Sequence, residues 1–102
     1  MQNLIEHAPA VAQAFFALTK SCRDQSPLDH HINELILIGI FTAQGSPRGL
    51  KTHIARALEN GASQADIIAA ITLALPVVGV TQVNQAMDTL MACLNTPDQG
   101  QG

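Results

Sequence analysis

The chain has 102 residues and a net charge of −3, and its five lysines and arginines form no run. This pattern argues against nucleic acid and anionic membrane as partners, and no apolar run reaches the roughly 18 residues of a membrane span. Charged residues make up only 13% of the chain, about half the usual share for a soluble domain, so we expect one domain that buries part of its surface between subunits.

Every periodic segment is typical of a helix, and no segment alternates as a strand would. A first helix is predicted over residues 9–18, with Pro9 in its first turn and Val11, Phe15 and Leu18 on one stripe. The polar residues 19–27 predict a connection.

A second helix is predicted from an N-cap at Asp29 to about Ala43, ending at Gly45. Because it is apolar on most sides, we expect it to be the central buried helix. A third helix follows, capped by Ser46 and opened by Pro47. Its inner stripe is predicted to hold Leu50, Ile54, Ala57 and Leu58 before Asn60 and Gly61 end it.

Ser63 and Asp66 resemble a capping box for a fourth helix over residues 64–78, which Pro76 should kink or end. A last helix begins at Thr81, and residues 95–102 are predicted to be a flexible tail. The sequence therefore predicts an all-α, single-domain bundle over residues 1–94, with about five to six helices around a central helical hairpin.

Glu34 stands alone among apolar residues of the second helix, and burying a lone carboxylate is costly unless something pairs with it. His53 lies 19 positions on, at the edge of the third helix's apolar stripe, and is the candidate partner. Such a pair is suited to general acid/base chemistry. The alternatives are a Glu34 on a wet face and a His53 that is a hydrogen-bonded core residue.

Arg48 and Lys51 are candidates to bind a small anionic ligand beside the N-terminus of the third helix, as is Arg56, although solvated surface charge is the commoner explanation. His30 and His31 precede Glu34 by about one turn, yet no metal-ligand motif is evident. We therefore predict neither a metal nor another cofactor.

The only two cysteines, Cys22 and Cys93, have no recognisable spacing. They are typical of buried or incidental thiols in a reducing compartment. The N-terminus also lacks a charged-then-apolar signal pattern. These features favour a cytoplasmic protein.

These segments, in this order, resemble the carboxymuconolactone decarboxylase and alkylhydroperoxidase D-like superfamily over nearly the whole chain. The resemblance is carried by Leu28-Asp29, Glu34-Leu35-Ile36, His53, Ala57, Asn60-Gly61-Ala62-Ser63, Asp66-Ile67-Ile68 and Gly79. It implies an all-α fold around a helical hairpin, assembled into trimers or hexamers.

In the peroxidase branch of that superfamily, a Cys-x-x-Cys pair ends four residues before the family histidine. Here the two positions hold Ser46 and Gly49. One thiolate must attack peroxide and the other must resolve the intermediate. The chain is therefore not expected to be a thiol peroxidase.

The decarboxylase branch works without that thiol pair. The resemblance then implies a lyase acting on a small carboxylated lactone, with His53 as general acid/base, Glu34 as its orienting partner, and Arg48 and Lys51 as substrate contacts. The alternative is a non-catalytic, oligomeric ligand-binding or scaffold member of the superfamily, favoured by the missing thiols and by His30-His31-Ile32-Asn33 at a commonly basic position.

Overall fold

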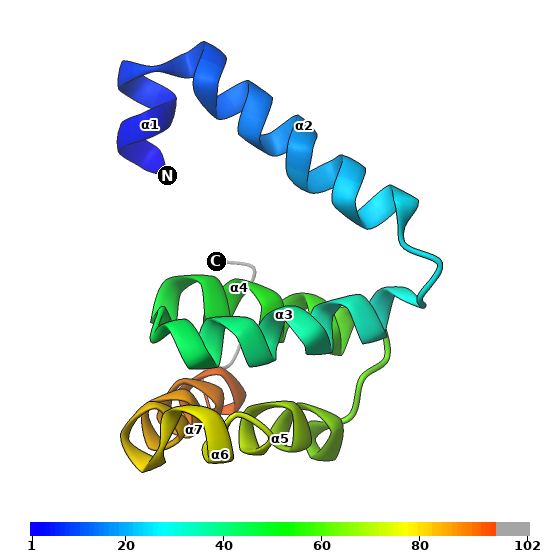
Figure 1. Cartoon of the computed structure of the whole chain (residues 1–102), viewed down its shortest axis with the longest axis vertical. Coiled ribbons are helices and arrows are strands. Elements are labelled where there is room, and N and C mark those ends of the chain that lie inside the picture. The colour runs from blue at the N-terminus through cyan, green and yellow to red at the C-terminus, as the bar shows by residue number, and fades with distance from the viewer. Residues whose placement is uncertain (96–102) are drawn as a thin grey trace.

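The computed structural model describes residues 1–95, which form helices and no strand, as the sequence predicts (Figure 1). The helices in chain order are α1 (Gln2–His7), α2 (Pro9–Gln25), α3 (His30–Gln44), α4 (Pro47–Glu59), α5 (Gln64–Thr72), α6 (Leu75–Val78) and α7 (Val80–Leu94). None of these helices is long and apolar enough to cross a membrane. Of the predicted tail, residues 96–102 lie outside the described residues.

The centre of the bundle is the hairpin of α3 and α4, on which α5 and α7 pack. Gly45 ends α3 in the left-handed region at φ 74°, which glycine adopts without steric cost. The core is aliphatic, and its fully buried side chains include Ile38, Ile54, Ile67, Ile71 and Leu90. Helix α3 packs against α4, α5 and α7 as predicted for a central helix, but its residues Ile36 and Ile40 are exposed. Leu58 of the predicted α4 stripe is exposed as well.

Of the three predicted helix N-caps, one forms the expected side-chain hydrogen bonds and two do not. Ser63 and Asp66 form the full capping box, since each side chain accepts a hydrogen bond from the other residue's backbone N–H at 3.0 Å. Asp29 and Ser46 precede α3 and α4 as expected, but neither side chain makes a capping hydrogen bond. Pro47 begins α4 without a backbone N–H, so one donor there needs no partner.

The predicted fourth helix is interrupted, and the break falls earlier than expected from Pro76. Helix α5 ends at Thr72, and Pro76 lies in the first turn of the four-residue α6. The physical reason is that a proline ring clashes with the carbonyl group four residues before it, which here belongs to Thr72. The helix therefore ends at that residue.

The connection predicted over residues 19–27 is wrong, because α2 continues to Gln25. The segment contains neither glycine nor proline before Pro27, and Lys20 donates to Asp24 one turn later, a spacing that stabilises helices. Polar composition alone is a poor indicator of a loop.

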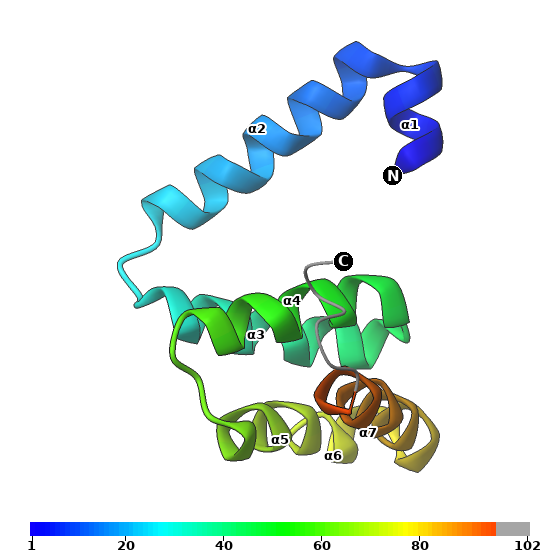
Figure 2. The same ribbon diagram turned by 180° about the vertical axis from the view of Figure 1, so that it is seen from behind.

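Helix α2 stands away from the α3–α7 bundle in both views, with α1 folded back beside its first residues (Figures 1 and 2). Only Ala12 of α2 is buried. The predicted stripe of Val11, Phe15 and Leu18 is exposed, at 43% or more of each residue. These residues are not part of the chain's own core.

Candidate functional site

Glu34 and His53 meet at the seam between α3 and α4. Glu34 Oε1 lies 2.5 Å from His53 Nδ1. The Glu34 side chain is 5% exposed and the His53 side chain 14%, so the histidine is the member of the pair that solvent reaches. The apolar helix thus obtains the partner that its isolated carboxylate requires.

The contact fixes the roles of the two imidazole nitrogens. A carboxylate only accepts hydrogen bonds, so Nδ1 carries the proton that it shares with Glu34. None of the described residues forms a hydrogen bond with Nε2, and the one fully buried side-chain nitrogen or oxygen without a partner among them is Asn33 Nδ2. Nε2 is therefore open to solvent and is the nitrogen able to exchange a proton with a bound molecule.

The ring of Phe41 stacks on the imidazole of His53, with ring centroids 5.1 Å apart and an interplanar angle of 15°. Phe41 follows Glu34 by two helical turns, so the two side chains share one face of α3. The histidine is consequently held from two directions, by the carboxylate at Nδ1 and by the ring at its face.

Gly49 provides the room for that stacking. A Cβ atom at position 49 would lie 2.5 Å from Phe41 Cε1 and 2.6 Å from Cδ1, far inside van der Waals contact. Any side chain there requires the ring to move. The position at which the peroxidase branch places a thiol is thus filled by the Phe41 ring, and Ser46 stands at the other thiol position.

The importance of Phe41 and Gly49 is absent from the sequence prediction. The sequence does contain a pattern that could have indicated their role. Gly49 precedes His53 by one helical turn, and Phe41 follows Glu34 by two helical turns. With both pairs at helical spacing, the contact of Glu34 with His53 brings the other two residues together as well.

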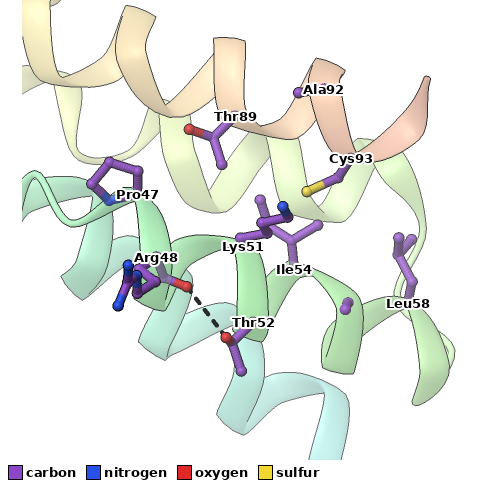
Figure 3. A pocket seen from close by; sticks show the side chains of 10 residues that line it. Pro47, Arg48, Lys51, Thr52, Ile54, Leu58, Thr89, Ala92 and Cys93 are labelled. Atoms are coloured by element: carbon purple, nitrogen blue, oxygen red, sulfur yellow. Dashed lines mark hydrogen bonds between the residues drawn. The ribbon is translucent and has the colours of Figure 1, made fainter. Parts of the chain in front are cut away.

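Arg48 and Lys51 lie on a different side of α4. Both line a pocket of about 830 Å³ between α4 and α7, and neither Glu34 nor His53 lines it (Figure 3). A second cavity of about 20 Å³ includes Phe41 but again neither member of the pair. The structure therefore does not bring the two predicted substrate contacts together with the two predicted catalytic residues.

The two cysteines occupy different environments, and both are free thiols. Cys22 is exposed on α2, whereas Cys93 lines the pocket between α4 and α7. Burial raises the pKa of the Cys93 thiol, and the nearby Lys51 charge opposes that rise. Cys93 is thus a poor nucleophile at neutral pH.

Among residues 1–95, no three or more His, Cys, Asp or Glu side chains are grouped closely enough to hold a metal ion. His30 and His31 begin α3, one turn before Glu34. The contact that the structure shows for Glu34 is the one with His53.

The fold and the site together are an all-helical domain with a glutamate–histidine pair across its central hairpin. The chain belongs to the carboxymuconolactone decarboxylase family, whose family model matches residues 9–91. The match runs from the start of α2 into α7, and it confirms the resemblance seen in the sequence. Comparisons with curated proteins and with solved structures gave no match.

Proposed function

We propose that this protein is a small carboxy-lyase in which His53 is the general acid and Glu34 orients it. The observation that carries the proposal is the 2.5 Å contact of Glu34 Oε1 with His53 Nδ1, together with a solvent-open Nε2. This geometry leaves one ring nitrogen to act on a substrate while the other is fixed.

The reaction is the loss of carbon dioxide from a small lactone that carries a carboxylate. The bond from the ring carbon to the carboxylate breaks, carbon dioxide leaves, and the electron pair stays on the carbon, delocalised toward the lactone carbonyl. Protonated Nε2 then delivers its proton to that carbon. Solvent restores the proton, and the Glu34 carboxylate stabilises the imidazolium form.

A substrate bound at Nε2 must contact residues besides His53. Neither cavity described above can supply those contacts, since His53 lines neither of them. The exposed apolar surface of α2 supports association of several copies. We propose that a neighbouring subunit completes the substrate site, as a homo-oligomer such as a trimer or hexamer would allow.

Replacement of His53 by Ala tests the catalytic proposal. We expect kcat for a small carboxylated lactone to fall by about 10²- to 10⁴-fold, the usual contribution of a positioned proton donor. Glu34→Gln should give a smaller loss, because the histidine stays and only its orientation and charge stabilisation weaken. His7→Ala is the matched control, since His7 is exposed and remote in sequence from the pair. Full turnover by the His53→Ala variant would remove His53 from the mechanism.

A second function is favoured by a separate observation, the pocket of about 830 Å³ that contains Arg48 and Lys51. It supports the proposal of a non-catalytic member that binds a small anionic ligand. Under this alternative the wild-type protein turns over no substrate, so His53→Ala has no activity to reduce. Ligand binding to the pocket persists in that variant.

A further inference from the structure

The pocket between α4 and α7 has the size and composition of a ligand site. Its volume of about 830 Å³ lies within the range of about 300–1,000 Å³ typical of small-molecule sites. It follows α4 from Pro47 to Leu58, a length of roughly 16 Å at 1.5 Å per residue. A ligand that extends along α4 can therefore contact the pocket at both ends.

The half of the pocket toward the C-terminal end of α4 is apolar and aliphatic. Its walls are formed by Ala55, Leu58, Ala92 and Cys93, with the fully buried Ile54 beneath them. Figure 3 shows the Cys93 sulfur pointing from α7 toward Ile54 and Lys51 on α4. Among the described residues, no aromatic ring lines the pocket, so it offers no stacking surface to a flat ligand.

The pocket is positively charged from the N-terminal end of α4 to its middle, where the Lys51 charge lies near Cys93. Arg48 and Lys51 line it, and no Asp or Glu of residues 1–95 is among the lining residues. The hydroxyl groups of the lining threonines are already engaged as donors, Thr52 to the Arg48 carbonyl oxygen (dashed in Figure 3) and Thr89 to that of Gln85. The attraction for an anion therefore rests on the two basic side chains.

We propose that this pocket binds an aliphatic carboxylate. The carboxylate lies between Arg48 and Lys51, and the hydrocarbon chain extends along Ala55 and Leu58. The two cations can pair with a carboxylate, and the aliphatic walls favour a ligand whose remainder is hydrocarbon. This inference rests on the ligand-binding alternative above and is independent of catalysis at His53.

Titration with decanoate, below its micelle concentration, tests the ligand class. Decanol is the neutral match, and we expect it to bind about tenfold more weakly because it lacks the charge. Shortening decanoate to octanoate should weaken binding about 15-fold through the loss of two buried methylenes. Equal binding of decanol and decanoate would overturn the proposed charge recognition.

Charge-removing variants test the binding residues. The double variant Arg48→Gln, Lys51→Gln should bind decanoate about tenfold more weakly and leave decanol binding unchanged. The control is Arg56→Gln, which removes a cation from the same helix but outside the pocket. Equal effects of the double variant and the control would show a general effect of net charge and contradict the proposal.

The two cysteines report where the ligand binds. Saturating decanoate should slow maleimide labelling of Cys93 at least about fivefold, since the ligand buries the thiol, and leave Cys22 unchanged. Ala55→Trp, which fills the pocket from an exposed position, should abolish both decanoate binding and the protection. Protection of both thiols, or of neither, would refute binding at this site.

A second copy of the chain is the competing occupant of the pocket. In that case Cys93 would be protected without ligand, and Ala55→Trp would reduce the mass measured by light scattering. That result would overturn the proposal. Conversely, retained decanoate binding by His53→Ala, with turnover lost, would separate this inference from the catalytic one.

Discussion

At the scale of single residues, Phe41 and Gly49 determine how His53 is presented. The ring covers one face of the imidazole, and the missing side chain of Gly49 is what allows it to do so. Glu34 fixes the ring nitrogen and Phe41 fixes the ring plane. The orientation of Nε2 is thus set by neighbours that do not themselves exchange protons with a substrate.

Gly49→Ala should destabilise the protein, although alanine is normally the better helix former. The added methyl group meets the Phe41 ring, and overpacking of this kind costs about 1–3 kcal/mol. The matched control is Gly39→Ala, where the new Cβ would lie 3.6 Å from the Ala70 carbonyl oxygen, an ordinary contact. That variant should be neutral or stabilised by up to about 1 kcal/mol. Urea denaturation measures both.

A double-mutant cycle attributes the cost to the ring. In a Phe41→Ala background, the destabilisation caused by Gly49→Ala should be smaller by at least about 1 kcal/mol, because the obstacle is gone. An equal cost in both backgrounds would show that the strain at position 49 has another origin.

The sequence predicts Glu34 and His53 more readily than their surroundings. An isolated carboxylate in an apolar helix demands a partner, and few polar side chains are near enough in the chain to supply one. Phe41 has no such distinguishing property, since it resembles any core residue. Its role depends on how α3 sits against α4, which is tertiary information.

The placement of Arg48 away from His53 follows from helix geometry. The two residues are five positions apart on α4, which corresponds to about 140° around a helix. The Arg48 side chain accordingly lines the pocket between α4 and α7, which His53 does not line. The sequence therefore indicates Arg48 and Lys51 as ligand contacts on α4. Placing them in one site with His53 neglects the angle around the helix that separates them from it.

At the scale of elements, the beginning of α5 illustrates a local motif that determines structure by itself. The Ser63 and Asp66 side chains satisfy two backbone donors at the helix end. The backbone and side-chain hydrogen bonds from Ser63 lower the pKa of Asp66. All information for this cap lies within four residues, which explains why the sequence predicts it correctly.

The lowered pKa of Asp66 has a definite consequence for stability against pH. A carboxyl whose folded-state pKa lies below its unfolded value of 3.8 stabilises the fold above that pH, and the contribution is lost as pH falls through the folded pKa. Asp66→Asn should therefore melt at a lower temperature than wild type at pH 7, and the difference should shrink below about pH 3. Thermal melts by circular dichroism measure this. A constant difference across that range would contradict a role for the charge.

Helices α2 and α5 show why helix ends are harder to predict than helices. The pattern places the end of α5 a few residues too late, because Pro76 acts on the carbonyl group four positions upstream. It places the end of α2 about two turns too early, because polar side chains at helical spacing have the composition of a loop. Both errors concern boundaries. The short helix α1 is not predicted, whereas the helical type of every other element is as predicted.

At the scale of the whole molecule, the apolar side of α2 does not pack against the core of the chain. It projects from the bundle in both views (Figures 1 and 2) and exposes Val11, Phe15, Phe16 and Leu18. Apolar surface of this extent on a small domain indicates association. The low share of charged residues has the same implication.

We expect the protein to have a mass in solution several times its 10.8 kDa chain mass, as measured by size-exclusion chromatography with light scattering. The double variant Phe15→Glu, Leu18→Glu should reduce that mass, because it places charge on the apolar stripe. Gln13→Glu adds charge to the opposite side of α2 and is the control. A monomeric wild type would contradict the expected assembly, and it would also remove the neighbouring subunit from the proposed substrate site.

The ring that lies over Gly49 also determines what it would take to give this site a redox thiol pair. A cysteine introduced at position 49 alone would press its Cβ against the Phe41 ring and would have no second thiol to resolve an oxidised intermediate. A working pair would therefore need three changes together, which are cysteines at positions 46 and 49 and a smaller side chain at position 41.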